Sequence, residues 1–167
     1  MRTAAYCRPY ETDMRTLVLG IGNSILGDDG VGVRVAQAVA SKIKDDSIDV
    51  MDVNVDGLNL FDFILGYDRL VVIDAIVTED GEIGEIYRLK PEQICSPSGS
   101  AISPHHYTLA STIEIGNRLF PREIPQDVVV FAINTEDASL ITEEMSEKVR
   151  EAVPRAVNLV LEEVGSI

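Results

Sequence analysis

The feature that most constrains the fold is an uninterrupted aliphatic run from Leu70 to Ile73, followed directly by Asp74. The run is too short for a buried helix, so residues 69–75 are expected to form a strand buried on both faces. Comparable apolar segments, bounded by glycine, proline or charged residues, predict further strands at residues 16–20, 48–53, 85–89 and 127–133. Strands of this kind are typical of parallel sheets that helices cover on both sides.

Segments with helical spacing of apolar residues alternate with these strands. They predict helices at residues 31–42, 58–65, 105–119 and 142–164. The alternation predicts one three-layer α/β domain with a mostly parallel sheet. Asp28 or Asp29 is expected to cap the first helix, and Pro154 is expected to kink the last one.

The ends and the longest connection carry weaker patterns. Residues 95–104 are rich in Ser, Pro and Gly and are expected to form a loop. Residues 1–14 are polar and precede the first strong patterning, so we expect an N-terminal extension there. The single domain is then expected to comprise residues 15–167.

The charge balance restricts the possible partners. The chain carries 28 acidic and 14 basic residues, a net charge of −14, which repels phosphate backbones and anionic lipid. Nucleic-acid and membrane binding are therefore disfavoured. Cys7 and Cys95 are the two cysteines and form no CxxC motif, which disfavours a disulfide framework or a thiolate zinc site. With no membrane-spanning run or secretory pattern, the expected location is the cytoplasm.

Three polar features are expected at the carboxyl ends of the strands, where open α/β sheets hold their sites. Asp29 follows the first strand, Asp74 ends the third predicted strand, and His105, next to His106, begins a helix. Two carboxylates and an imidazole form a partial ligand set for a divalent transition metal and leave positions open for other ligands. Each residue also has a structural interpretation, as a helix cap, a turn cap or a surface histidine respectively.

Other chemistries find less support. The turn from Gly20 to Gly22 lacks the third glycine of a dinucleotide-binding motif, since that position holds Ile25, and no Walker motif is present. Neither a GxSxG nucleophile motif nor an HExxH zinc motif occurs. Cys95 and His105 could form a catalytic thiol–imidazole pair, but the only support for this interpretation is that they lie near each other in the sequence.

The segment from Gly20 to Gly32, GIGNSILGDDGVG, resembles the N-terminal signature of the hydrogenase maturation proteases. The resemblance continues at VIDA (residues 72–75) and SPH (residues 103–105), and extends from about Arg15 to the C-terminal helix. It implies a three-layer α/β/α fold, phosphorylase/hydrolase-like, with a mixed, mostly parallel and twisted sheet.

The resemblance also implies an activity. Family members are endopeptidases that remove a C-terminal extension from the nickel-loaded precursor of a [NiFe]-hydrogenase large subunit. Asp29, Asp74 and His105 match the implied nickel ligands, and His106 could replace His105. The precursor supplies the nickel, and no other cofactor is implied. The implied attacking group is a water molecule that is activated near the metal or by Asp29 or Asp74. The free protein is expected to be a monomer.

One departure leaves alternatives open. Many relatives carry a DGGTxG-like loop after the second strand, whereas this chain has Asp52–Leu58, in which only Asp52 and Gly57 match. A checkpoint protein that binds the nickel-loaded precursor without cutting it is one alternative. A receiver-type phosphoacceptor domain is another, although the last strand is followed by Asn134 and Thr135 rather than by the required lysine. A peptidyl-tRNA hydrolase-like enzyme fits the acidic charge poorly.

Overall fold

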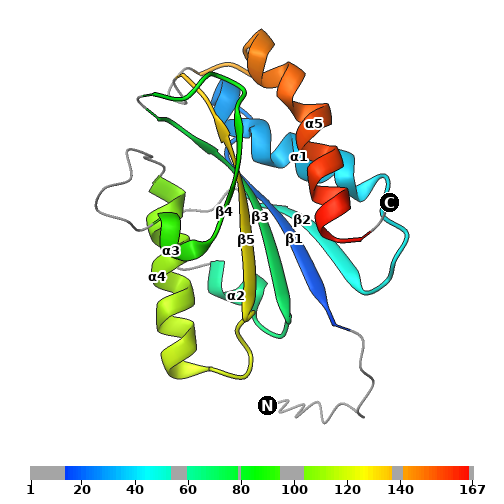
Figure 1. Cartoon of the computed structure of the whole chain (residues 1–167), viewed down its shortest axis with the longest axis vertical. Coiled ribbons are helices and arrows are strands. Elements are labelled where there is room, and N and C mark those ends of the chain that lie inside the picture. Colours follow the sequence, from blue (N-terminus) through cyan, green and yellow to red (C-terminus); the bar gives the residue numbers. More distant parts are fainter. Residues whose placement is uncertain (1–13, 54–59, 79, 95–103, 137–140, 166–167) are drawn as a thin grey trace.

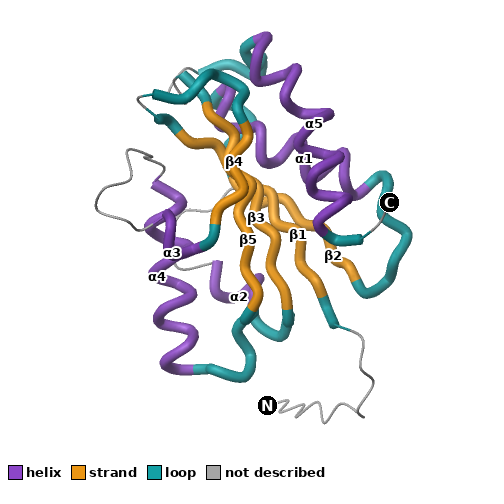
Figure 2. Tube along the Cα trace, viewed as in Figure 1, coloured by secondary structure: helices purple, strands orange, loops and turns teal. Residues whose placement is uncertain are grey.

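The computed structural model describes residues 14–53, 60–78, 80–94, 104–136 and 141–165, with the backbone alone at residues 92, 94 and 104–108. A five-stranded sheet in the order β2-β1-β3-β5-β4 forms its centre (Figures 1 and 2). β4 runs antiparallel to β5 and the other pairs are parallel, as the mixed, mostly parallel prediction requires. The strands are β1 (Thr16–Ile21), β2 (Ile48–Val53), β3 (Arg69–Ile76), β4 (Ile86–Leu89) and β5 (Asp127–Asn134).

Helices cover both faces of this sheet, which confirms the three-layer prediction. The helices are α1 (Val31–Ala40), α2 (Leu60–Ile64), α3 (Pro91–Ile94), α4 (Pro104–Leu119) and α5 (Glu147–Glu163), with a 3-10 turn η1 (Gly27–Gly30) before α1. α1 and α5 contact each other on one face, and α2 and α4 contact each other on the opposite face (Figure 1). In the described part of the chain, no helix has both the length and the apolar character that a bilayer span requires.

The alternation of side chains along β3 builds both cores. Val71 and Ile73 belong to the cluster under α1 and α5, whereas Leu70 and Val72 belong to the cluster under α2 and α4. All four side chains are fully buried. A strand that is buried on both faces needs a continuous apolar run, which is why this segment is so distinct in the sequence.

Two glycines bring α1 against the ends of the strands. A Cβ atom on Gly32 would lie 2.2 Å from the carbonyl oxygen of Ile21 and 2.4 Å from that of Ile73. A Cβ atom on Gly20 would lie 2.3 Å from the carbonyl oxygen of Gly32. Any side chain at either position would push the helix away, so these glycines fix the start of α1 over β1 and β3.

The expected cap of the first helix is wrong. Gly30 occupies the N-cap position of α1 and makes no side-chain cap bond, while Asp28 and Asp29 lie in η1 before it. Their carboxylates accept hydrogen bonds from other parts of the backbone, which removes them from a capping role.

The closing helix also begins later than predicted, at Glu147 instead of residue 142. Thr142 forms a parallel bridge with Leu26, and this pairing holds the segment before α5 in an extended conformation. The helix continues through Pro154 to Glu163. Most of the expected extension and of the 95–104 loop lies outside the described residues, which include only Met14 and the backbone of Pro104 from these two segments.

Candidate functional site

The carboxyl edge of β1 and β3 is where the chain leaves neighbouring strands toward opposite faces of the sheet. β1 leads through η1 to α1 on one face, and α2 and α4 cover the other face. Such a switch point between parallel strands opens a crevice that commonly holds the site of an α/β protein. η1 contacts β3, so residues that follow β1 lie close to β3 at this edge.

Asp29 lies in η1 and is 8% exposed. Its Oδ2 atom accepts a hydrogen bond of 2.7 Å from the backbone N–H of Asn23, in the turn that follows β1. A Cβ atom on Gly22 would lie 1.9 Å from the carbonyl oxygen of Asp29. The turn and the acidic residue are therefore packed directly against each other, which fixes the position of this carboxylate.

Asp28, its neighbour, has a different role. Its Oδ1 atom accepts a hydrogen bond of 2.7 Å from the backbone N–H of Ser146, the N-cap residue of α5. The residues are 118 positions apart, and the local sequence pattern around either one gives no sign of the contact. Asp28 thus anchors α5 to the turn, and a pocket of about 460 Å³ beside it is lined partly by Glu136 and Glu144.

Asp74 is fully buried inside β3, two residues before the strand ends at Ile76, so the prediction that it ends the strand is wrong. The strand continues because Ala75 and Ile76, which follow Asp74, pair in register with Ile133 and Asn134 of β5. The Oδ1 atom of Asp74 accepts a hydrogen bond of 2.8 Å from the backbone N–H of Ala75. Side chains alternate along a strand, so Asp74 lies on the α2 and α4 face together with Val72.

His105 lies in the first turn of α4, together with His106. One turn further on, Leu109 is buried in the core under α4. The helix leads to the start of β5, so its first turn lies toward the carboxyl edge of the sheet. The side chains of both histidines are outside the described part of the structure. Among the side chains that are described, no group of three His, Cys, Asp or Glu residues is placed to hold a metal ion.

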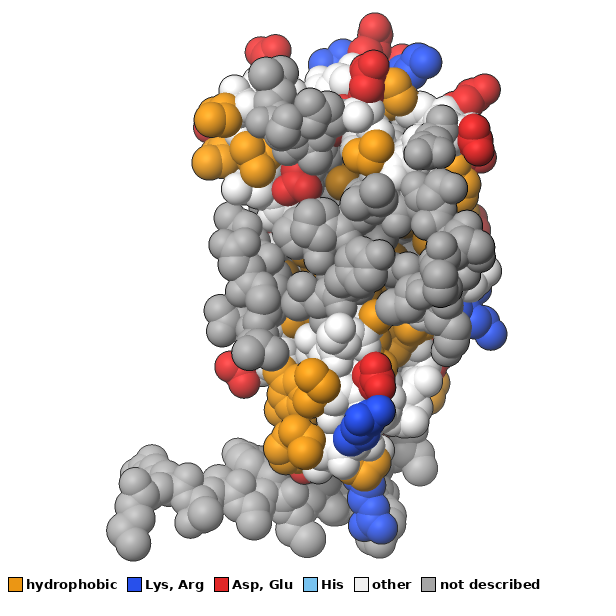
Figure 3. Space-filling model, turned by 90° about the vertical axis from the view of Figure 1, so that its left-hand side faces the viewer, with side chains coloured by type: hydrophobic (Ala, Val, Ile, Leu, Met, Phe, Trp, Pro, Cys, Tyr) orange, Lys and Arg blue, Asp and Glu red, His pale blue; other side chains and the backbone are white. Residues whose placement is uncertain are grey.

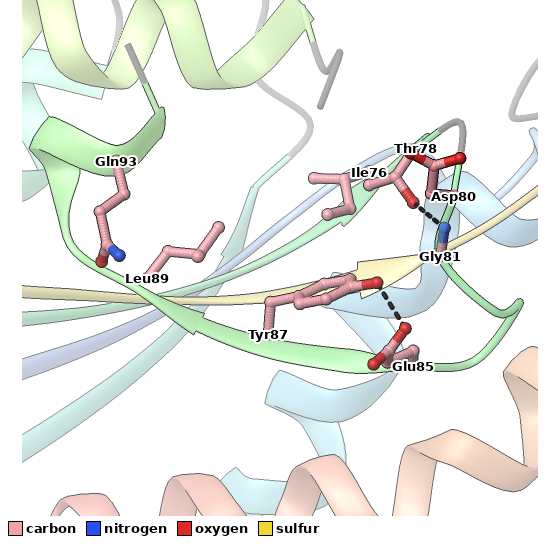
Figure 4. A pocket seen from close by; sticks show the side chains of 8 residues that line it. All are labelled: Ile76, Thr78, Asp80, Gly81, Glu85, Tyr87, Leu89 and Gln93. Carbon is pink, nitrogen blue, oxygen red and sulfur yellow. Dashed lines mark hydrogen bonds between the residues drawn. The ribbon is translucent and has the colours of Figure 1, made fainter. Parts of the chain in front are cut away.

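A pocket of about 430 Å³ opens beyond Asp74, where Ile76 forms part of its wall. Figure 4 shows Tyr87 in the middle of this pocket, with its hydroxyl directed toward Glu85. The hydroxyl donates a hydrogen bond to the Glu85 carboxylate, and this bond raises the pKa of Tyr87. No sequence pattern indicates this pocket, because its walls come from β3, β4, α3 and the turn between the strands.

The surface on the α4 side carries both charged and hydrophobic side chains. Figure 3 shows most of the visible acidic side chains toward the end of the molecule that holds the carboxyl edge, together with basic ones, and hydrophobic side chains toward both ends. Ile115 and Leu119, in the last turns of α4, and Phe120, directly after it, are 44%, 64% and 41% exposed. The acidic character of the chain is therefore present near the candidate site.

Comparisons with known proteins agree with this architecture. The family model described as hydrogenase maturation protease matches residues 33–163. The hydrogenase 2 maturation protease of Escherichia coli K12 is 31% identical over 72% of this chain and 73% of its own length. The delta subunit of coenzyme F420 hydrogenase from Methanothermobacter thermautotrophicus is 28% identical over 94% of this chain and 98% of its own length.

A solved structure supports the same assignment. The hydrogenase maturating endopeptidase HybD from Escherichia coli superposes with a TM-score of 0.78 at 26% sequence identity, covering 92% of this chain and 93% of that one. Because the family model matches well over half of the chain, the sequence resemblance is confirmed along with the fold. The chain belongs to the hydrogenase maturation protease family, a family of endopeptidases.

Proposed function

We propose that this protein is the endopeptidase that removes a C-terminal extension from the nickel-loaded precursor of a [NiFe]-hydrogenase large subunit. The observation that carries the proposal is the arrangement of Asp29 and Asp74. Both are buried carboxylates, and they lie on elements that contact each other at the carboxyl edge of the sheet. The first turn of α4, with His105, lies toward the same edge.

In this proposal nickel belongs to the substrate. Asp29, Asp74 and His105 offer two oxygen ligands and one nitrogen ligand, an incomplete set for a divalent transition metal. Such a set holds free nickel weakly. Ligands from the precursor complete the coordination, so the enzyme engages a loaded precursor much more strongly than an empty one.

The chemical step needs a base beside the scissile peptide. Asp29 or Asp74 accepts a proton from a water molecule as its oxygen adds to the peptide carbonyl carbon. The carbon–nitrogen bond then breaks, and the proton passes to the leaving amine. Backbone hydrogen bonds from Asn23 and Ala75 hold the two carboxylates in place for this role.

We further propose that residues 15–167 work as one domain, as a monomer in the cytoplasm when free of substrate. The presence of only two cysteines, Cys7 and Cys95, without a CxxC motif supports a reducing compartment. The net charge of −14 opposes self-association and favours partners with a basic surface.

The test uses the purified protein and its cognate precursor, with and without nickel, and measures the precursor mass by mass spectrometry. Loss of a C-terminal peptide only from the nickel-loaded precursor is the expected result. A stable complex with an unchanged precursor mass would instead identify a checkpoint that binds without cutting.

The adjacent histidines provide a matched pair for the ligand assignment. His105→Ala is expected to lower the processing rate at least about 100-fold, because loss of one ligand weakens recognition of nickel. His106→Ala is expected to retain most of the activity. The reverse pattern would transfer the ligand role to His106 and contradict the assignment.

A further inference from the structure

β4 is the last strand on its side of the sheet, and part of its backbone faces outward. Asn134 donates a backbone hydrogen bond of 2.8 Å to the carbonyl oxygen of Glu85, just before β4. Bonded and non-bonded pairs alternate in an antiparallel ladder, so Ile86 and Arg88 direct their N–H and C=O groups away from β5. Outside the β4–β5 ladder, no backbone hydrogen bond involves these two residues in the described part of the chain.

The pocket of about 430 Å³ follows the same strand. Figure 4 shows Glu85, Tyr87 and Leu89 along one side of it, with Gln93 at the end near α3. Tyr87 and Leu89 also pack against the core under α4, so they form an apolar floor. Edge backbone and pocket therefore lie on the same stretch of chain, an arrangement suited to an extended peptide.

The pocket also adjoins the strand that carries Asp74. Ile76 lines the pocket, and Ile76 lies two residues after Asp74 in the same strand. At the end nearest this residue, Asp80 and Glu85 contribute carboxylates, and the lining contains no lysine or arginine among the described residues. That end therefore fits a segment whose side chain is cationic or donates hydrogen bonds.

We propose that the precursor segment beside the cleavage position binds as an added strand along the outer edge of β4. This proposal rests on the proposed function, since it names where that substrate docks. Ile86 and Arg88, about 7 Å apart along the strand, each exchange hydrogen bonds with the added segment. A side chain of the segment enters the pocket at Tyr87, and the chain continues past Ile76 toward Asp74.

Hydrogen exchange of the full chain tests the docking directly. The amides of residues 84–90 are followed by mass spectrometry with and without a saturating amount of nickel-loaded precursor. Exchange in this segment is expected to slow at least about tenfold in the complex, because the outward N–H groups become bonded. The opposite edge strand, β2, is the internal control and is expected to exchange at an unchanged rate.

Proline substitutions at the two edges give a matched pair. Ile86→Pro removes an outward N–H and places a ring against the added strand, whereas the β4–β5 ladder keeps its bonds. Val50 is the counterpart on β2. The backbone N–H of Gly22 donates to the carbonyl oxygen of Val53, so Val53 directs its backbone groups toward β1. Backbone groups alternate in direction along a strand, so Val50, three residues earlier, directs its N–H away from β1. Both side chains pack at the margin of the same core cluster.

Ile86→Pro is expected to lower kcat/KM for precursor processing at least about tenfold, mainly through a higher KM. Val50→Pro is expected to change kcat/KM less than about twofold. Thermal unfolding of both variants shows whether each is folded. If Ile86→Pro does not fold, the hydrogen-exchange experiment on the unmodified chain tests the docking by itself.

The outcomes separate the docking from the cleavage. Slower exchange in β4 supports the docking, and if the precursor mass stays unchanged only the proposed cleavage fails. Cleavage, or a stable complex, without slower exchange in β4 overturns the docking and leaves the proposed function standing. Absence of any complex with the loaded precursor overturns both.

Discussion

The backbone N–H of Asn23 donates a hydrogen bond of 2.7 Å to the Oδ2 atom of Asp29. This bond closes the turn after β1 onto a carboxylate that is almost fully buried. A loop that is tied to a carboxylate in this way holds it in one orientation before any substrate arrives. The segment from Gly20 to Gly32, which carries the family signature, therefore fixes the position of the Asp29 carboxylate at the candidate site.

Asp29→Asn should separate the charge of this residue from its shape. The amide oxygen of Asn can still accept the Asn23 hydrogen bond, so we expect a melting temperature close to that of the unmodified protein. The rate of processing of the loaded precursor is expected to fall at least about 100-fold, because an amide is a poor metal ligand and cannot act as a general base. Asp28→Asn, measured in the same assay, should retain activity; equal losses would contradict a specific role for Asp29.

Gly22→Ala is expected to destabilise the fold by about 3 kcal/mol or more. Gly22 has a φ of +142°, and an added Cβ atom would lie 1.9 Å from the Asp29 carbonyl oxygen, so both backbone strain and overlap oppose the change. Gly66→Ala is the control, because Gly66 also has a positive φ of +83° but a methyl group added there would meet no atom within 4 Å. It should cost only about 1 kcal/mol in urea unfolding. Similar losses in both variants would show that overlap with Asp29 is unimportant.

Ser146→Pro tests the contact between Asp28 and α5. The φ of Ser146 is −57°, which proline adopts without strain, so the main local loss is the N–H that donates to Asp28. Leaving a buried carboxylate without this donor is expected to cost about 1–3 kcal/mol of unfolding free energy. Ser146→Ala keeps the N–H and removes a hydroxyl that makes no cap bond, so its effect should stay within about 0.5 kcal/mol.

Stability at low pH should depend on Glu163. Its carboxylate accepts hydrogen bonds from Arg88, and these bonds, together with the charge of Arg69, lower the pKa of Glu163 below its usual 4.5. A lowered pKa in the folded state contributes stability above pH 4.5, and this contribution disappears as the pH falls through and below that value.

Glu163→Gln is therefore expected to lower the unfolding free energy at pH 7 by on the order of 1 kcal/mol and to flatten its decline on acidification. Urea unfolding at a series of pH values measures both effects. Glu114→Gln, which breaks an exposed i,i+4 pair with Arg118, is the control and should follow the unmodified protein. If the unfolding free energy of Glu163→Gln declines with falling pH as steeply as that of the unmodified protein, this ion pair does not contribute to the acid sensitivity.

The sequence by itself determined the element types and the layer arrangement. Residues 69–75 could be assigned to a buried strand because burial on both faces requires consecutive apolar side chains. The candidate residues Asp29, Asp74 and His105 could be grouped because the carboxyl ends of parallel strands share one edge. These inferences depend on patterns among near neighbours, which the chain carries directly.

Only the tertiary structure decided which partners the acidic residues meet. Asp28 bonds to Ser146, 118 positions away, and Asp29 bonds to the turn at Asn23, so neither caps α1 as the local pattern suggested. Pairing of Ala75 and Ile76 with β5 likewise extended β3 beyond Asp74. A local pattern records which side chains are buried, whereas hydrogen-bond partners, strand order and the pocket beside β4 depend on segments that meet only when the chain is packed.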